Sequence, residues 1–197
     1  MASLEGVDRR TLLTEREKWN FYAIAMLIVA IAIPVGLGFL GSTFGGGGGE
    51  SDWYKSLDKP SWTPPGYVFP IMWTTLYILM GIASYLIWKE GGFRVQAYPL
   101  AVYALQLVLN LAWTPLFFGL HRPDISLGEI VVLWLAVAGT IYMFFHVNHV
   151  AAYLLIPYIL WLTVATALNA YIYMHNPILS GDAYHDITTP LRGPNST

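Results

Sequence analysis

Charged residues are missing from four long stretches of this chain, within which apolar residues dominate. The stretches without Asp, Glu, Lys or Arg are Phe21–Gly49, Gly66–Trp88, Val95–Leu120 and Ile130–Gly181. A helix needs about 20 mainly apolar residues to cross roughly 30 Å of membrane hydrocarbon. The first three stretches have room for one such helix each, and the last has room for two separated by a short turn. The pattern predicts spans at Phe21–Leu40, Val68–Trp88, Ala97–Leu120, Leu127–Phe145 and Ala151–Met174.

These spans predict an all-α integral membrane protein, a bundle of five transmembrane helices. In lipid, each backbone N–H group must find its partner within the protein, which a helix provides by itself. The strands of a membrane barrel would be about 10 residues long and would alternate in polarity, and these segments do not. A soluble bundle is disfavoured because its helices would each need a polar face toward water.

Composition agrees with a membrane location. Hydrophobic residues make up 56% of the 197 residues and charged residues only 11%, against about 25% charged in a soluble domain. The formal net charge of -2 gives no reason to expect a nucleic-acid partner. Cysteine is absent, which excludes disulfides and thiol chemistry.

Local signals suggest where the helices begin and end. Two capping boxes fit helix starts: Thr14 with Glu17, before the first span, and Ser126 with Glu129, at the fourth. Gly91–Gly92 is expected to end the second helix and Pro123 the third. The chain then divides into a polar segment at 1–19, a membrane domain at 20–176 and a polar tail at 177–197.

The distribution of basic residues suggests an orientation. Six lie near the spans on the N-terminal side: Arg9, Arg10, Arg16, Lys18, Lys89 and Arg94. Three lie on the other side: Lys55, Lys59 and Arg122. The positive-inside rule therefore favours a cytoplasmic N-terminus.

Polar and aromatic residues recur at helical spacing inside three spans. Polar residues at such depth usually face the bundle interior and often mark a site. The residues that share faces are Trp73 and Tyr77, then Gln106, Asn110 and Trp113, then Trp161, Ala165 and Leu168. They predict a mostly aromatic cavity, suited to a large, flat, apolar ligand. Hydrogen bonding between helices and ordinary core packing explain the same spacing equally well.

The first loop, Trp53–Pro70, is stiffened by Pro60, Pro64, Pro65 and Pro70. It also carries two tryptophans, Trp53 and Trp62. Burying these rings over the mouth of the bundle would make the loop a lid. A rigid anchor at the membrane surface is the alternative.

No conventional catalytic site is apparent. The spans contain no Ser/His/Asp order, glycine-rich phosphate loop or carboxylate pair. His146 and His149, in the turn between the last two spans, are weak candidates for binding a haem iron. Interfacial histidines in a short turn explain them more simply.

Three motifs resemble the translocator protein family, also called tryptophan-rich sensory proteins or peripheral-type benzodiazepine receptors. The first is WYKSLDKPSWTPPGYVFPIMWTTLYILMGIA, from Trp53 to Ala83. The second is QLVLNLAW, from Gln106 to Trp113, followed by Phe117–Phe118. The third is LIPYILW, from Leu155 to Trp161, followed by Ala165 and Leu168–Asn169. The resemblance covers roughly Asn20 to Met174.

The resemblance implies a five-helix bundle, often a homodimer in the lipid bilayer, with a ligand pocket under the first loop. A protein of this family would need no cofactor. The ligands of its pocket would be tetrapyrroles such as porphyrin or haem, sterols, or synthetic drugs. Family pocket positions correspond to Trp53, Trp73, Tyr77, Asn110, Trp113, Trp161, Ala165 and Leu168. A eukaryotic member would lie in the mitochondrial outer membrane or endoplasmic reticulum, and a bacterial one in the cell membrane.

Three functions remain open on this basis. The first is a receptor or sensor that binds tetrapyrroles and other flat apolar molecules and takes part in a stress response. The second is a carrier of sterol or porphyrin between membranes. The third is light-dependent porphyrin breakdown, in which Trp53 and Trp161 would act as electron donors. Cholesterol-specific binding is not expected, because Met174 follows Leu168 and Tyr171 where the family's sterol motif has a basic residue.

Overall fold

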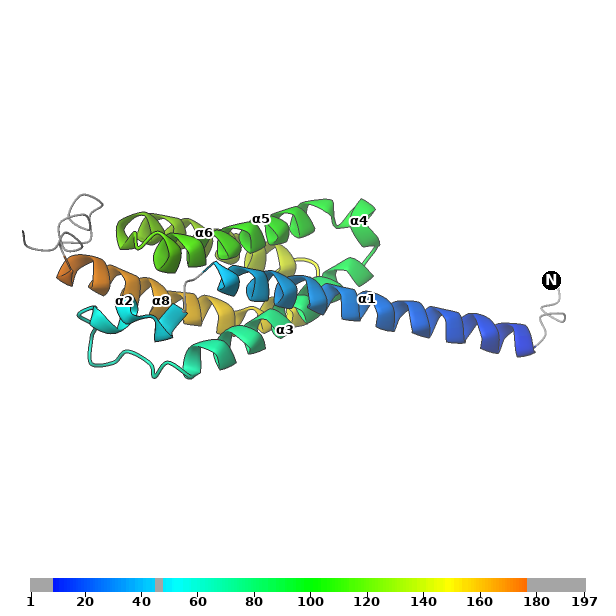
Figure 1. Ribbon diagram of the computed structural model, residues 1–197. Coiled ribbons are helices and arrows are strands. Elements are labelled where there is room, and N and C mark those ends of the chain that lie inside the picture. Colours follow the sequence, from blue (N-terminus) through cyan, green and yellow to red (C-terminus); the bar gives the residue numbers. More distant parts are fainter. Residues whose placement is uncertain (1–8, 45–47, 177–197) are drawn as a thin grey trace, which may run out of the picture.

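The computed structural model describes residues 9–44 and 48–176, with side chains from Asn20 onward. Every regular element in these ranges is helical. The elements are α1 (Arg9–Thr43), η1 (Gly48–Glu50), α2 (Asp52–Ser56), α3 (Val68–Lys89), α4 (Gly92–Val95), α5 (Ala97–Thr114), η2 (Pro115–Gly119), α6 (Pro123–Phe145), α7 (His149–Leu154) and α8 (Ile156–His175). Figure 1 shows the long helices side by side, with α1 extending beyond the others at its N-terminal end.

The predicted five-span bundle is confirmed. Five helical stretches are long and apolar enough to cross a bilayer. They begin at Asn20 within α1, Val68, Ala97, Pro123 and His149. Each predicted span lies inside or within one residue of an observed one, because the length of an uncharged apolar run is fixed by the thickness of the membrane.

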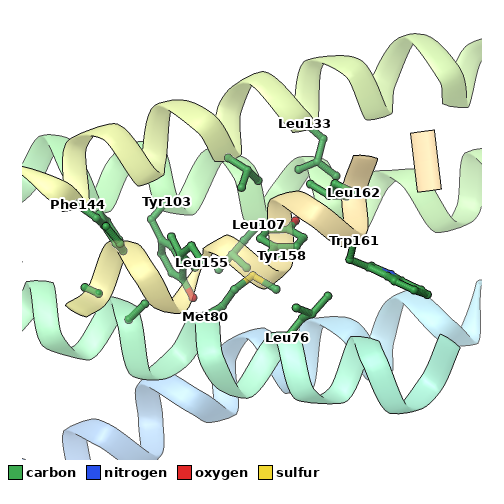
Figure 2. Packing of buried hydrophobic residues seen from close by; sticks show 14 of the residues in the cluster. Leu76, Met80, Tyr103, Leu107, Leu133, Phe144, Leu155, Tyr158, Trp161 and Leu162 are labelled. Atoms are coloured by element: carbon green, nitrogen blue, oxygen red, sulfur yellow. The ribbon is translucent and has the colours of Figure 1, made fainter. Parts of the chain in front are cut away.

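The core lies between α3, α5, α6, α7 and α8. One face of α3 supplies Leu76, Met80, Ala83 and Ile87, whose spacings of four and three place them on the same side of the helix. They meet Tyr103 and Leu107 of α5 and buried residues of the later helices (Figure 2). By contrast, α1 contributes to this cluster only the half-buried Leu37, among its described side chains, and contacts chiefly α3.

A glycine allows α1 to approach α3 closely. A Cβ atom at Gly81 would lie 2.4 Å from Ile31 Cα and 2.7 Å from the Ala30 carbonyl oxygen. No side chain fits in that space, so the two backbones touch directly at Gly81. Small residues at helix contacts are a common means of packing membrane helices, whose apolar surfaces gain nothing by leaving lipid.

Both predicted capping boxes are wrong. The helix α1 begins at Arg9 and passes through Thr14 and Glu17 without a break. The helix α6 begins at Pro123, so Ser126 is already inside it. The Ser126 hydroxyl instead donates a hydrogen bond of 3.0 Å to Asn169 Oδ1 on α8. A tertiary contact therefore uses the hydroxyl that the sequence pattern assigned to a cap.

Gly91–Gly92 ends the second span as predicted, but Pro123 was assigned to the wrong helix. After α3, Gly91 and Gly92 have φ values of 122° and 69°, which favour glycine. Pro123 does not end the third span but opens α6, where its missing N–H group has no helical partner to lose. The third span ends instead through the π-helical turn η2.

The fifth span is not one continuous helix. It is interrupted at Leu155, where α7 ends and α8 begins. Pro157 lies in the first turn of α8, and a proline there lacks the N–H group that would continue the hydrogen bonds of α7. Asn148 caps α7 by accepting a hydrogen bond of 3.1 Å from the Ala151 backbone N–H.

Candidate ligand cavity

A cavity of about 590 Å³ lies between α1 and α3, at the end of the bundle that carries the first loop. Its α3 wall is aromatic, formed by Phe69, Trp73 and Tyr77. Its remaining lining residues are Val35, Gly38, Phe39, Ser42, Gly48, Pro70, Thr74 and Thr114. The volume falls in the range of about 300–1,000 Å³ that is usual for small-molecule sites.

The α3 wall is held in place by stacking and hydrogen bonds. The rings of Trp73 and Tyr77 stack, with centroids 5.6 Å apart. The Tyr77 hydroxyl donates a hydrogen bond of 2.9 Å to Asn110 Oδ1 on α5. Asn110 Nδ2 in turn donates one of 2.9 Å to the hydroxyl of Tyr158 on α8. This relay links three helices and fixes the Tyr77 ring, so the wall is rigid before any ligand arrives.

Gly38 of α1 lies against the same ring. A Cβ atom at Gly38 would be 2.0 Å from Tyr77 Cε2, closer than any real contact. The absence of a side chain therefore lets the Tyr77 ring lie directly against the α1 backbone. Any larger residue at position 38 would push either the ring or the helix, and both form the cavity wall.

A second polar cluster ties the ends of α5, α6 and α8 together. Asn169 Oδ1 accepts hydrogen bonds from Trp113 Nε1 at 3.3 Å and from the Ser126 hydroxyl at 3.0 Å. Asn169 Nδ2 donates one of 2.8 Å to the Pro123 carbonyl oxygen. The buried amide thus has partners for both of its polar atoms, as a stable bundle requires.

The start of the first loop forms a plug over the ends of α5 and α8. Trp53, Tyr54 and Leu57 pack in one apolar cluster with Phe117 and Leu168. Trp53 contacts Phe117 edge to face, with centroids 5.4 Å apart, and stacks on His121 at 4.3 Å. Trp53 is half-buried in this cluster and Trp62 is 50% exposed, so the expected burial of both tryptophans is met only in part, at Trp53.

The plug is also held by hydrogen bonds at its edge. The Asp58 backbone N–H donates to Asn176 Oδ1 at 2.9 Å, and Asn176 Nδ2 donates back to the Asp58 carbonyl at 3.0 Å. The Lys59 ammonium donates to the carbonyl oxygens of Tyr54 at 2.6 Å and Leu57 at 2.9 Å. A cation at the carboxyl end of a short helix stabilises the carbonyl groups that lack helical partners.

Burial in this plug changes three protonation equilibria. It raises the pKa of Tyr54 to about 12. It also lowers the pKa of Lys59 and the pKa of His121 below their usual values. In each case the charged form is the one that loses solvation, so all three groups favour their neutral forms more than they would in water.

The structure places the predicted site residues at several different positions. Trp73 and Tyr77 line the cavity, and Asn110 and Trp113 border a small void directly behind them. Trp161 lies beside the cavity, its ring 5.7 Å from that of Phe69, and Figure 2 shows it at the margin of the core. Ala165 packs against the main core, while Trp53 and Leu168 belong to the plug. Gln106 lies deeper, with its Nε2 3.8 Å from Met80 Sδ, and does not reach the cavity.

The α1 half of the cavity carries no residue that the sequence pattern predicts for the site. Val35, Gly38, Phe39 and Ser42 form this wall, and none shares a polar pattern with the later helices. The signal that was available is a cluster of glycines in α1, at positions 36, 38 and 41. Glycines repeated within an apolar span indicate close approach of another group, here the Tyr77 ring.

Several buried polar atoms lack a hydrogen-bond partner among the described residues. They include the indole nitrogens of Trp53 and Trp161 and both carboxylate oxygens of Glu129. Glu129 lies in the second turn of α6 with its oxygens covered by protein. The Trp161 indole nitrogen is thus a buried donor without a partner among the described residues, on a ring whose centroid is 5.7 Å from that of Phe69 in the cavity wall.

The two histidine candidates for haem binding lie at the opposite end of the bundle from the cavity. His146 Nδ1 is 2.8 Å from the Tyr142 carbonyl oxygen, and His149 stacks on Phe145 at 4.3 Å. Within residues 9–44 and 48–176, no group of three or more His, Cys, Asp or Glu side chains gathers to hold a metal ion.

Comparison with known proteins identifies the family. The model of the TspO/MBR family matches residues 30–174, well over half of the chain. The chain belongs to the TspO/MBR family. It is therefore a multi-pass membrane protein of the group whose members carry the names translocator protein and tryptophan-rich sensory protein.

Relatives in this family come from bacteria and from animals. The human translocator protein is 44% identical over 140 residues, which cover 70% of this chain and 82% of the relative. The tryptophan-rich sensory protein of Cereibacter sphaeroides is 44% identical over 118 residues, 60% of this chain and 73% of the relative. The tryptophan-rich protein TspO of Chlorobaculum tepidum is 39% identical over 159 residues, 78% of this chain and 98% of the relative.

Proposed function

We propose that this TspO/MBR protein is a membrane receptor that binds a tetrapyrrole, such as a porphyrin or haem, in the cavity between α1 and α3. The observation that carries the proposal is the cavity itself, about 590 Å³ with an aromatic wall of Phe69, Trp73 and Tyr77. Aromatic faces favour offset stacking with a flat conjugated ring. The hydroxyl groups of Ser42, Thr74 and Thr114 also line the space and would orient polar substituents.

Binding rather than reaction is the activity that this geometry supports. Among the described residues, the cavity lining contains no carboxylate, histidine or lysine that would act as a general acid or base. The relay from Tyr77 through Asn110 to Tyr158 holds the wall rigid, and a rigid wall lowers the entropy lost on binding. Porphyrin or haem is thus the ligand, and no further cofactor is needed for this role.

Transfer of a sterol or porphyrin to the bilayer is a second candidate function, favoured by the position of α1. This helix forms the outer wall of the cavity, and Phe39 in that wall is 75% exposed on the bundle surface. A ligand leaving between α1 and α3 would enter lipid directly. Ligand-dependent exchange between two populations of vesicles would distinguish a carrier from a receptor.

The proposal is tested by quenching of tryptophan fluorescence with protoporphyrin IX, in detergent and in the dark. Thr74→Phe places a bulky ring inside the cavity and should raise Kd by about five- to 150-fold, because overfilling costs about 1–3 kcal/mol. Thr75→Phe is the matched control, since Thr75 is exposed on the same helix but does not line the cavity. Equal Kd values for the two variants would place the ligand elsewhere.

The same titration under illumination addresses porphyrin breakdown. The Trp161 indole lies beside the Phe69 wall, and its buried nitrogen has no hydrogen-bond partner among the described residues. Loss of porphyrin absorbance in light that is slowed in Trp161→Phe would support a photochemical role for this residue. Stable absorbance under light in the wild type would leave binding as the only activity.

A further inference from the structure

A second cavity, of about 220 Å³, lies at the opposite end of the bundle from the first. It runs between α1 and α5, with α3 as its floor. Its lining is almost wholly aliphatic and aromatic and includes Val29 and Ile33 of α1, Trp88 of α3, and Leu100 and Leu107 of α5. Figure 1 shows α4 at this end of α3, and Phe93 of α4 completes the rim.

The shape of this groove is that of a channel along the helices. It extends along α5 from Leu100 to Leu107, which at about 1.5 Å per residue is roughly 10 Å. Val29 and Ile33 are 49% and 51% exposed, so the α1 wall faces the surroundings of the bundle. In a membrane those surroundings are lipid. The part of a lipid that fits an extended apolar groove is its alkyl chain.

Two basic residues directly follow rim residues of the groove in the sequence. Lys89 follows Trp88 at the end of α3, and Arg94 follows Phe93 in α4. Both are exposed, and neither forms an ion pair within the part of the chain that the structure describes. The segment that joins α3 to α5 contains one acidic residue, Glu90. Together with Lys89 and Arg94 it gives this segment a net charge of +1.

Aromatic rings mark this rim as the level of the lipid headgroups. Trp88 lies 5.9 Å from Tyr22 and 6.2 Å from Tyr85, measured between ring centroids, and Phe93 is 68% exposed. Trp and Tyr rings gather where hydrocarbon meets headgroups. Lys89 and Arg94 are also on the side of the membrane that the distribution of basic residues assigns to the cytoplasm, where anionic lipids are concentrated.

From these observations we infer that the groove between α1, α3 and α5 is a binding site for an anionic phospholipid of the bilayer. One acyl chain lies in the groove, and the phosphate lies at the rim beside Lys89 and Arg94. This site is separate from the cavity beside Trp73 and does not depend on the identity of the ligand there. It gives the protein a preference for anionic membranes that its overall negative charge would not predict.

The test measures contact between Trp88 and lipids with brominated chains, which quench tryptophan on contact. The protein is placed in phosphatidylcholine nanodiscs that contain brominated phosphatidylglycerol or, as the control lipid, brominated phosphatidylcholine. Subtracting the signal of Trp88→Phe isolates the Trp88 contribution. The inference predicts that phosphatidylglycerol quenches this contribution at a severalfold lower mole fraction than phosphatidylcholine.

Variants separate the headgroup contact from the chain contact. The double variant Lys89→Gln/Arg94→Gln should lose this severalfold preference, to which each basic residue contributes up to about fivefold. Lys55→Gln, which removes a cation at the other end of the bundle, should keep it. Ala104→Phe, at an exposed position of the lining, should fill the groove and weaken quenching by the anionic lipid. Equal quenching by the two lipids in the wild type, or a preference that survives in the double variant, would overturn the inference.

Discussion

The side-chain amide of Asn176, at the end of α8, pairs with the backbone of Asp58 in the first loop through two hydrogen bonds of 2.9 and 3.0 Å. A third bond, of 2.8 Å, runs from Asn176 Nδ2 to the Ile172 carbonyl and holds the amide in position. The pair joins segments 118 residues apart in the chain. It is therefore a latch between the plug over the bundle and the last transmembrane helix.

Removing this latch should loosen the plug without unfolding the bundle. Asn176→Ala loses both bonds to Asp58, each worth about 0.5–1.5 kcal/mol. We expect faster amide hydrogen exchange in residues 53–60 and unchanged exchange in α3 and α5. His175→Ala is the control, because His175 is exposed and contacts only its own helix in the described structure. Identical exchange in the two variants would show that the latch does not hold the plug.

The plug should also respond to alkaline pH through Tyr54. Burial raises the pKa of this phenol to about 12 from an ordinary value of 10.0. The folded plug thus retains the proton more strongly than the unfolded loop, so its stability is fully present below pH 10 and is lost as the pH rises through about 12. The tyrosinate absorbance of the wild type minus that of Tyr54→Phe should therefore titrate near pH 12, and a midpoint near 10 would mean that Tyr54 is not buried.

Contact between α1 and α3 should depend on Gly81. In Gly81→Ala the new methyl group would meet Ile31 and Ala30, so α1 must move, at a cost of about 1–3 kcal/mol. We expect a lower Tm in detergent. Gly36→Ala is the matched substitution in α1, where nothing lies within 4 Å of the added atom. There the better helix propensity of alanine should leave Tm equal or higher, and a fall as large as that of Gly81→Ala would refute the close-approach argument.

Trp161 should contribute to ligand affinity from beside the cavity. Its ring supports Phe69 edge to face, and Trp161→Ala should weaken protoporphyrin IX binding by roughly 1–3 kcal/mol if it acts as an anchor. Trp134→Ala is the control, since Trp134 lines a groove of α6 and α8 and bonds to Thr163 there. An unchanged Kd in a folded Trp161→Ala protein would remove this residue from the site.

The sequence predicts the spans well because an uncharged apolar run of about 20 residues matches the thickness of the membrane hydrocarbon and is typical of a transmembrane helix. The helix ends were predicted less well, since a hydroxyl such as that of Ser126 serves equally as a cap or as a tertiary donor. Its choice depends on Asn169, which is 43 residues away. No local pattern contains that information.

The candidate site was predictable on α3 and not on α1. Trp73 and Tyr77 share a helical face and do line the cavity, whereas the contribution of Gly38 is the absence of a side chain. Spacing also placed Gln106 and Asn110 on one face, but depth along the helix separates them, and only Asn110 reaches the wall through Tyr77. Periodicity gives the face of a helix and does not give the level at which a cavity opens.

The measurement that tests the central claim most directly is the position of a bound porphyrin in the bundle. Manganese protoporphyrin IX is paramagnetic and broadens methyl NMR signals according to their distance from the metal. The claim predicts the strongest broadening at the methyl groups of Val35 and Thr74, and little at Ala104 and Ala151 near the other end of the bundle. Uniform broadening, or broadening strongest at Ala104, would contradict a tetrapyrrole site between α1 and α3.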